Sequence, residues 1–213
     1  MYDLPLFPLN TVLFPGTPIS LHIFEERYKL MMNRCLEQKT PFGVVLIDEG
    51  EEALGSLARP HTVGCTARVQ QVQPMAEGRM NILAIGQERF RIVNLKDDQP
   101  YLVGEVESFP LAGANAAAVT GEMGELRPLV LQYLEILTRV GDVDLDPTQL
   151  PEEPLRMAYL AAALLRVPTA KKQQILGSPS ARRMLRLMRH YYREEIDVMQ
   201  LIPADQQGPF SLN

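Results

Sequence analysis

The stretch from Gly50 to Ser56 has the spacing of a phosphate-binding loop. Gly50 and Gly55 have four residues between them, as the two glycines of a P-loop do. In a P-loop, a Lys follows the second glycine and reaches the phosphates, but Ser56 stands there in this chain. Glu51 and Glu52 lie inside the loop, and their carboxylates would repel a phosphate group. The sequence therefore predicts no ATP binding at this loop.

A second spacing is similar to that of a calcium-binding EF-hand loop. Asp142, Asp144 and Asp146 alternate, and Glu153 follows Asp142 by eleven residues, which matches four of the ligand positions. The sixth position must be Gly because the loop turns sharply there. Here it is Pro147, whose φ is locked at a negative value. We therefore expect an acidic helix connection without calcium.

Cysteine and histidine provide little sign of catalysis or metal binding. Cys35 falls on the apolar side of an expected helix and Cys65 within an expected strand, so both are predicted to be buried as small hydrophobic residues. His22, His61 and His190 are far apart in the sequence and form no local ligand cluster. No serine lies in a Gly-x-Ser-x-Gly motif. Spacing alone does not exclude a Ser–Lys dyad, because its members need not be adjacent.

The strongest charge pattern is a basic segment at residues 166–193. It carries eight Lys and Arg and no Asp or Glu, so its charge is +8. Because the whole chain has a net charge of −5, the residues outside this segment have a net charge of −13. Arg182, Arg186, Arg189 and Arg193 recur at helical spacing and form one stripe. The stripe either docks an acidic peptide, a nucleic acid or an acidic partner, or pairs with the chain's own carboxylates. We favour the second interpretation. Nucleic acid is the least favoured ligand, because the chain is acidic and no aromatics interleave with the arginines.

Length and composition predict a soluble globular protein of one or two domains. The chain has 213 residues, of which 46% are hydrophobic and 22% are charged. No apolar run reaches the roughly 18 residues of a membrane span, and no basic start precedes an apolar stretch as in a signal peptide. Two cysteines are too few for a disulfide framework. The expected location is the cytoplasm, with no membrane partner.

The first half of the chain has the patterns of β-strands with one helix among them. Apolar runs and alternating stretches of strand length are bounded by Gly and Pro. Tyr28, Met31, Met32 and Cys35 lie at i, i+3, i+4 and i+7 and predict a helix over residues 25–37. Strands in this number favour a small closed or nearly closed barrel, because closure leaves no exposed edge. The expected strands are residues 42–47, 63–72, 80–93 and 101–109.

Beyond about residue 110 the apolar period changes from two to 3.6. The small residues from 112 to 118 form a linker or a frayed helix start. Helices follow, the last of them starting after Ser180 as a cap and the third closed by Gly177. We therefore expect two domains, a β-rich one over residues 1–112 and an α-helical one over 113–213. The expected helices are 126–137, 154–166, 171–176 and 180–201.

Several stretches together resemble the N-terminal substrate-recognition domain of the ATP-dependent Lon protease. The opening reads Leu-Pro-Leu-Phe-Pro-Leu from residue 4 and ends in Phe-Glu-Glu-Arg-Tyr at 24–28. Residues 63–69 resemble the family's Val-Gly-Thr-x-Ala-x-Ile stretch, and residues 78–92 its Gly-Arg and Gly-x-x-Arg-Phe-Arg-Ile signature. Residues 172–185 are similar to its closing helical segments. The resemblance covers almost the whole chain.

This resemblance implies an α+β fold, with an N-terminal PUA-like pseudo β-barrel that contains one inserted helix, followed by a C-terminal helical bundle. It also implies a recognition module for unfolded polypeptides or degrons, without the ATPase and protease parts, and hence a non-enzymatic protein with no catalytic residues, cofactor or metal. The implied partners are polypeptide segments or a protein, a separate Lon-type protease among them. The alternative is an RNA-binding module, since PUA-like barrels also serve RNA.

We expect the binding site in a groove between the barrel and the bundle, because domain junctions commonly form pockets. Apolar side chains would contact the polypeptide from the barrel and basic ones from the bundle. Glu25, Arg27 and Arg89 are expected instead to form internal charge pairs. The candidate binding residues are Phe14, Ile23, Phe24, Tyr28, Arg186, Arg189 and Arg193.

Overall fold

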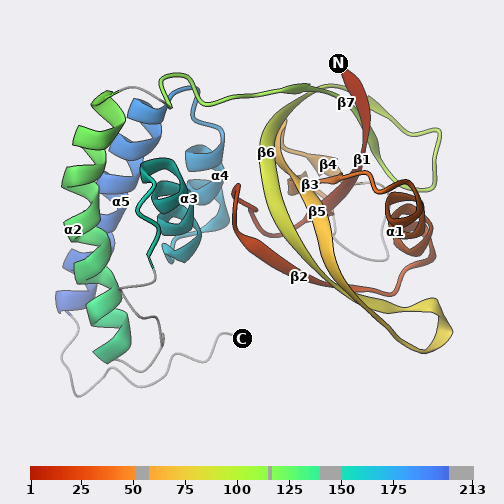
Figure 1. The fold of residues 1–213 in the computed structure, drawn as a ribbon, viewed down its shortest axis with the longest axis horizontal. Coiled ribbons are helices and arrows are strands. Elements are labelled where there is room, and N and C mark those ends of the chain that lie inside the picture. Colours follow the sequence, from red (N-terminus) through yellow and green to blue (C-terminus); the bar gives the residue numbers. More distant parts are fainter. Residues whose placement is uncertain (51–57, 115–116, 140–149, 202–213) are drawn as a thin grey trace. The chain divides into compact units, whose positions relative to one another are not determined.

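The computed structural model describes residues 1–50, 58–114, 117–139 and 150–201. The chain divides into two compact units (Figure 1). The first comprises Met1–Pro110 together with Thr169–Gly177, and the second comprises Leu111–Pro168 and Ser178–Asn213. Strands dominate the first unit and helices the second, so the predicted α+β class is confirmed. The boundaries expected at 1–112 and 113–213 stay a prediction, and they differ from these units in the placement of residues 111–112 and 169–177.

The first unit is built on one mixed sheet. Its strands β1 and β3 pair in parallel and its other pairs are antiparallel. The pairings run from β1 to β7, β6, β5 and β3, and β3 pairs again with β1, so the circuit closes. Strand β2 pairs with β6 outside this circuit. The strands are β1 (Tyr2–Leu9), β2 (Pro18–Ile23), β3 (Phe42–Glu49), β4 (Arg59–Pro60), β5 (Val63–Pro74), β6 (Met80–Lys96) and β7 (Val103–Ser108).

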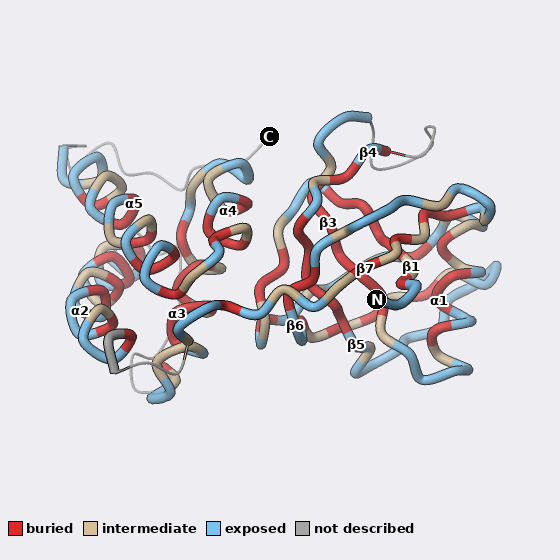
Figure 2. The backbone as a smooth tube through the Cα atoms, turned by 90° about the horizontal axis from the view of Figure 1, so that it is seen from above, coloured by how far each residue is buried: buried red, intermediate tan, exposed pale blue. Residues whose placement is uncertain are grey.

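Helix α1 (Glu26–Gln38) covers one part of this sheet. Its buried residues are Tyr28, Met31, Met32 and Cys35, the face that the helical spacing predicted. They pack in one cluster with residues of β1, β3 and β6, including Phe7, Phe42 and Ile82. Along the strands, burial is continuous over most of β3 and the start of β5, whereas buried and half-buried residues alternate along the first part of β6 and along β7 (Figure 2). Apolar burial against the sheet therefore holds α1 in place.

Two glycines of the sheet allow neighbouring groups to approach their backbone closely. A Cβ on Gly64 would lie 2.6 Å from the Phe90 ring, and a Cβ on Gly86 would lie 2.3 Å from the Phe14 carbonyl oxygen. Gly86 also donates its N–H to the Thr17 carbonyl and accepts from Gly16 N–H, at 3.0 and 2.8 Å. The segment before β2 is thereby fixed against β6, which sets the starting point of β2.

Helix α4 (Thr169–Leu176) belongs to the first unit although it lies between helices of the second in the sequence. The Gln173 side-chain amide donates to the Val63 carbonyl at 2.9 Å. Arg89 is buried in β6 and donates to the Leu176 carbonyl at 2.5 Å. A cation at the C-terminal end of a helix is favourable because the last carbonyls carry partial negative charge. Arg89 thus binds a helix end, whereas the expected internal charge pair forms between Arg27 and Glu25, at 3.0 Å.

The second unit consists of α2 (Ala117–Arg139), α3 (Pro154–Leu164) and α5 (Ala181–Leu201). Tyr133 of α2 and Tyr192 of α5 meet edge to face, with ring centroids 5.2 Å apart. The Tyr192 hydroxyl donates to the Ala161 carbonyl at 2.8 Å, which ties α5 to α3. Burial of this hydroxyl raises the pKa of Tyr192 well above its ordinary value. The aromatic pair thus joins the helices through an apolar contact and a buried hydrogen bond.

The predicted elements correspond closely to those of the structure. The strands expected at 42–47, 63–72, 80–93 and 101–109 are β3, β5, β6 and β7 with ends shifted by a few residues. Helix α2 begins well before residue 126, since buried Val119 and Met123 extend its apolar face. The sequence did not predict this first part of the helix, because it contains Gly121 and Gly124 and glycine is a weak helix former.

Candidate functional site

A hollow of about 280 Å³ lies beside β2 and the start of α1 in the first unit. Its floor is apolar: Phe7 stacks on Tyr28 with ring centroids 4.2 Å apart, and both are buried. The guanidinium of Arg27 lies over the Tyr28 ring, 4.7 Å from its centroid. The lining residues are Phe7, Leu9, Ser20, Leu21, His22, Ile23, Phe24, Glu25 and Tyr28.

Phe24 stands at the rim of this hollow and is 44% exposed. It follows the last residue of β2 and precedes α1, so the turn between strand and helix holds it toward solvent. The His22 ring stacks against it, with centroids 5.8 Å apart. A large apolar side chain at the edge of an apolar hollow is suited to contact an apolar ligand group.

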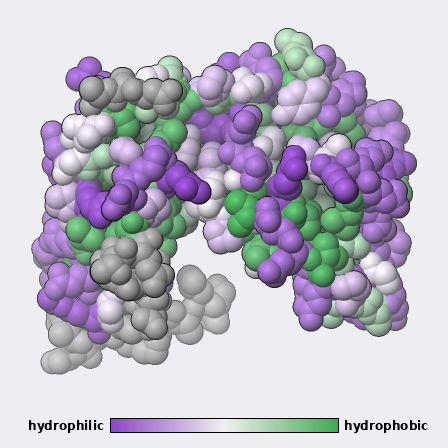
Figure 3. Space-filling model, in the orientation of Figure 1, coloured by the Kyte–Doolittle hydropathy of each residue, from purple (hydrophilic) through white to green (hydrophobic). Residues whose placement is uncertain are grey.

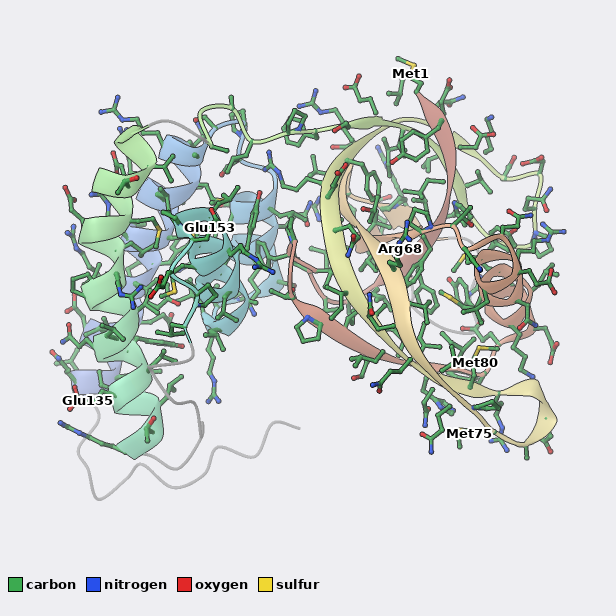
Figure 4. The ribbon with its side chains drawn as sticks, in the orientation of Figure 1. Met1, Arg68, Met75, Met80, Glu135 and Glu153 are labelled. Atoms are coloured by element: carbon green, nitrogen blue, oxygen red, sulfur yellow. The ribbon has the colours of Figure 1, made fainter. Side chains whose placement is uncertain are left out.

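A second hollow, of about 590 Å³, extends over β2, β6 and β5. Polar side chains cross its three strands in a row: His22 Nδ1 lies 2.7 Å from Asn81 Oδ1, and Asn81 Nδ2 donates to Gln73 Oε1 at 3.3 Å. In the space-filling view, hydrophobic and hydrophilic residues mix over these strands (Figure 3). Figure 4 places Met75 and Met80 at the far end of the β5–β6 hairpin. The lining residues are Ser20, Leu21, His22, Gln71, Val72, Gln73, Asn81, Ile82 and Leu83.

Three of the apolar candidate residues come together at the first hollow. Ile23, Phe24 and Tyr28 all line it, although Ile23 and Tyr28 are buried and only Phe24 is largely exposed. Phe14 is fully buried and is not among the lining residues. The role of these four residues in binding stays a prediction, and the geometry favours Phe24 as the residue that meets a ligand.

The basic candidates lie on α5 in the second unit. Arg189 forms ion pairs with Glu122, at 3.1 Å, and with Glu125, both on α2. Arg182 also approaches Glu122, at 3.6 Å. Arg186 and Arg193 are exposed. Part of the stripe therefore pairs with carboxylates of its own unit, and its role as a docking surface stays a prediction.

Both thiols are buried, as predicted. Cys35 belongs to the cluster under α1, and Cys65 lies in β5 with no exposed surface. Burial raises the pKa of the Cys35 thiol, and it raises the pKa of Cys65 to about 12. Because only the thiolate is a good nucleophile, neither group is suited to covalent chemistry at neutral pH.

The calcium-like spacing loses one of its ligands to helix capping. The Glu153 carboxylate accepts hydrogen bonds from the N–H groups of Leu155 and Arg156, at 2.9 and 2.7 Å, at the start of α3 (Figure 4). The three aspartates, and residues 51–57 of the phosphate-loop spacing, lie outside the described residues. Within the described ranges, His, Cys, Asp and Glu side chains form no group of three that could hold a metal ion. No helix there combines the length and hydropathy needed to cross a bilayer.

Sequence reasoning missed Ser20, Leu21 and His22, which line both hollows. The alternation of apolar and polar residues at 19–23, which read Ile-Ser-Leu-His-Ile, was a signal for a strand. Which edge of that strand stays unpaired depends on distant β6, and no local pattern carries that information. The sequence likewise indicated that Phe7 belongs to an apolar opening strand, but it did not indicate that Phe7 lines a hollow.

The family model for the substrate-binding domain of the ATP-dependent protease La (Lon) matches residues 3–192. The chain belongs to the Lon substrate-binding domain family. The resemblance inferred from the opening and the Gly-x-x-Arg-Phe-Arg-Ile stretch is thereby confirmed.

The chain is similar in sequence to part of several Lon proteases. A Lon protease of Anaeromyxobacter dehalogenans is 24% identical over 200 residues, which cover 93% of this chain and 24% of the relative. A Lon protease of Brevibacillus choshinensis is 26% identical over 209 residues, covering 93% and 26%. The chain therefore spans about a quarter of the length of these relatives.

Solved structures of Lon N-terminal domains share the fold. The N-terminal domain of a Mycobacterium avium complex Lon protease aligns with a TM-score of 0.69 at 17% identity, covering 91% of this chain and 99% of that one. A Lon N-terminal domain protein from Xanthomonas campestris aligns with a TM-score of 0.58 at 24% identity, covering 88% and 98%. At these identities the likeness supports the fold alone.

Proposed function

We propose that this protein is a non-enzymatic recognition module that binds unfolded polypeptide segments at the hollow beside β2 and α1. The observation that carries the proposal is exposed Phe24 above a buried apolar floor, in a domain of the Lon substrate-binding family. Unfolded chains expose the apolar side chains that such a floor would remove from water. Ile23 and Tyr28 form part of the floor, and Phe24 makes the contact.

The closed circuit of strand pairings supports a PUA-like pseudo-barrel for the first unit. The matched region corresponds to about a quarter of each Lon relative, which makes a Lon-type protease a candidate partner. An adaptor in protein quality control would hold an unfolded client and present it to such a protease. In this role, the clients would carry degron segments.

Reduced, carboxymethylated α-lactalbumin is a suitable permanently unfolded probe for this site. Phe24→Ala should weaken its binding by about fivefold to tenfold, since truncating a half-exposed Phe removes about 1 kcal/mol of apolar contact. Val93→Ala is the matched control, because Val93 is also in the first unit and is 50% exposed but does not line the hollow. Fluorescence anisotropy at equilibrium measures both affinities.

Equal affinity of the wild type and Phe24→Ala would contradict the site. A single-stranded RNA oligonucleotide belongs in the same assay as the competing ligand. RNA binding that falls steeply with salt, together with no binding of the unfolded protein, would replace polypeptide recognition by the RNA-binding alternative.

A further inference from the structure

Strand β2 is hydrogen-bonded along one edge only within the described part of the chain. It pairs with β6 in an unbroken antiparallel register from Pro18 opposite Ile85 to Ile23 opposite Met80. No second strand of the described residues pairs with it. An unpaired strand edge presents free N–H and C=O groups and is a template for another extended chain.

The register determines which residues of β2 face outward. Thr17 accepts a hydrogen bond from Gly86 N–H, and residues bonded to one neighbouring strand alternate along an antiparallel pair. Odd-numbered Ile19, Leu21 and Ile23 therefore direct their backbone groups to β6. Ser20 and His22 direct theirs to the open edge, where no described backbone group bonds them.

The open edge is accessible from both sides. Ser20, Leu21 and His22 line the hollow beside α1 and also the hollow over β5 and β6. Pro18 lacks an N–H and ends the open edge at its start, and the strand has only six residues. A strand this short accepts a few residues of an added chain and resists open-ended assembly.

Charge favours a polypeptide over a nucleic acid on this edge. The residues that line the two hollows include no Lys or Arg, and Glu25 is the charged residue among them. No lining cation would pair with phosphate groups, and the nearby Arg27 is already paired with Glu25 at 3.0 Å, whereas a peptide backbone is neutral. The spacing of the Ser20 and His22 groups along an extended strand matches the repeat of another extended peptide.

We infer that β2 accepts an extended client segment as an added strand, with main-chain hydrogen bonds to Ser20 and His22 and an apolar side chain at the hollow under Phe24. This inference rests on the proposed polypeptide recognition and names its mode. Main-chain pairing is tolerant of sequence, while the apolar hollow selects hydrophobic segments. Folded proteins, whose strands are already paired, do not compete for the edge.

Backbone methylation of a peptide tests the inference without altering the protein. The probe is fluorescent Lys-Val-Thr-Val-Thr-Val-Lys with blocked ends, and its partner carries N-methyl groups on two consecutive central residues, so that both peptide edges lose a donor. We expect the methylated peptide to bind at least about tenfold more weakly, as loss of main-chain hydrogen bonds predicts. Equal binding of the two peptides would overturn strand addition.

Amide hydrogen exchange of the full chain provides a second, direct measurement. Binding of the unmethylated peptide should slow exchange at Ser20 and His22, while Leu21, already bonded to β6, changes little. Unchanged exchange at Ser20 and His22 with the peptide bound would also overturn the inference. Slow exchange at both amides without peptide, together with a dimer in sedimentation, would assign the edge to a second copy and overturn it as well.

The variant Ser20→Pro removes the outward N–H without breaking a bond to β6, and Ser20→Ala is its matched control. We expect weak peptide binding by the first variant and wild-type binding by the second, with equal far-UV circular dichroism. If carboxymethylated α-lactalbumin binds but neither methylation nor Ser20→Pro matters, strand addition fails and the proposed function stands. If neither probe binds the wild type, both fail.

Discussion

Burial of Cys65 in the core of the first unit makes the free energy of unfolding depend on pH. Its thiol has a pKa of about 12 in the folded chain and an ordinary value of 9.0. Between these values the unfolded chain has released the proton and the folded chain retains it, so the free energy of unfolding falls as pH rises. The loss approaches about 1.4 kcal/mol per pH unit at most, and it vanishes below pH 9.

We expect Cys65→Ala to flatten this alkaline decline, although the smaller side chain lowers stability at neutral pH. Urea titrations at intervals from pH 8 to 11 measure the free energy of unfolding of both proteins. The buried Tyr192 also retains its proton, but it does so in both proteins and cancels in the difference. Parallel stability curves above pH 9 would refute the assignment of this decline to Cys65.

The ion pairs between α2 and α5 distinguish one arginine of the basic stripe from its neighbours. Arg189 contacts Glu122 and Glu125, whereas Arg186 is exposed on the same helix. Arg189→Glu should lower the free energy of unfolding by about 1 kcal/mol, because attraction becomes repulsion between partly exposed groups. Arg186→Glu, the matched control, should stay within about 0.5 kcal/mol of the wild type.

Chemical denaturation at low and high salt checks this prediction. High salt should narrow the difference in the free energy of unfolding between the two variants, since salt screens charges near the surface. Equal stability of both variants at low salt would mean that the Arg189 pairs contribute nothing measurable. The comparison also shows which arginines can be altered in binding studies without disturbing the helices.

Helices and strands could be predicted wherever the spacing of apolar residues along the local sequence determined them. The spacing of Tyr28, Met31, Met32 and Cys35 predicted both α1 and its buried face. The same reasoning predicted α4 as a helix, but it did not predict contact with β5, because Gln173 reads as a polar surface residue in the sequence. Glu153 likewise matched a calcium ligand by spacing, and its capping role depends on where α3 begins.

At the scale of the whole molecule, the first unit needs a helix that the chain supplies late. A fragment of residues 1–112 lacks α4, which leaves Arg89 without the Leu176 carbonyl and Val63 without Gln173. We expect a synthetic peptide of residues 168–178 to raise the melting temperature or the folded fraction of this fragment. A Gln173→Ala peptide should bind several-fold more weakly, since it lacks one buried hydrogen bond.

Circular dichroism and calorimetry of the fragment with increasing peptide provide the measurement. No response to either peptide would show that α4 adds nothing to the stability of the strand unit. Responses of equal size would show that apolar contacts of α4, rather than the Gln173–Val63 bond, hold it there.

The discontinuous first unit also has a consequence for synthesis on the ribosome. The chain leaves the strand unit at Pro110, builds most of the helical unit, and returns for Thr169–Gly177 before leaving again. During translation, the nascent strands emerge long before α4 does. The surface later covered by α4, including the Val63 carbonyl and the Arg89 guanidinium, stays open to solvent or to a chaperone until that return. Vectorial folding of this protein therefore completes its first unit only when the second is largely made.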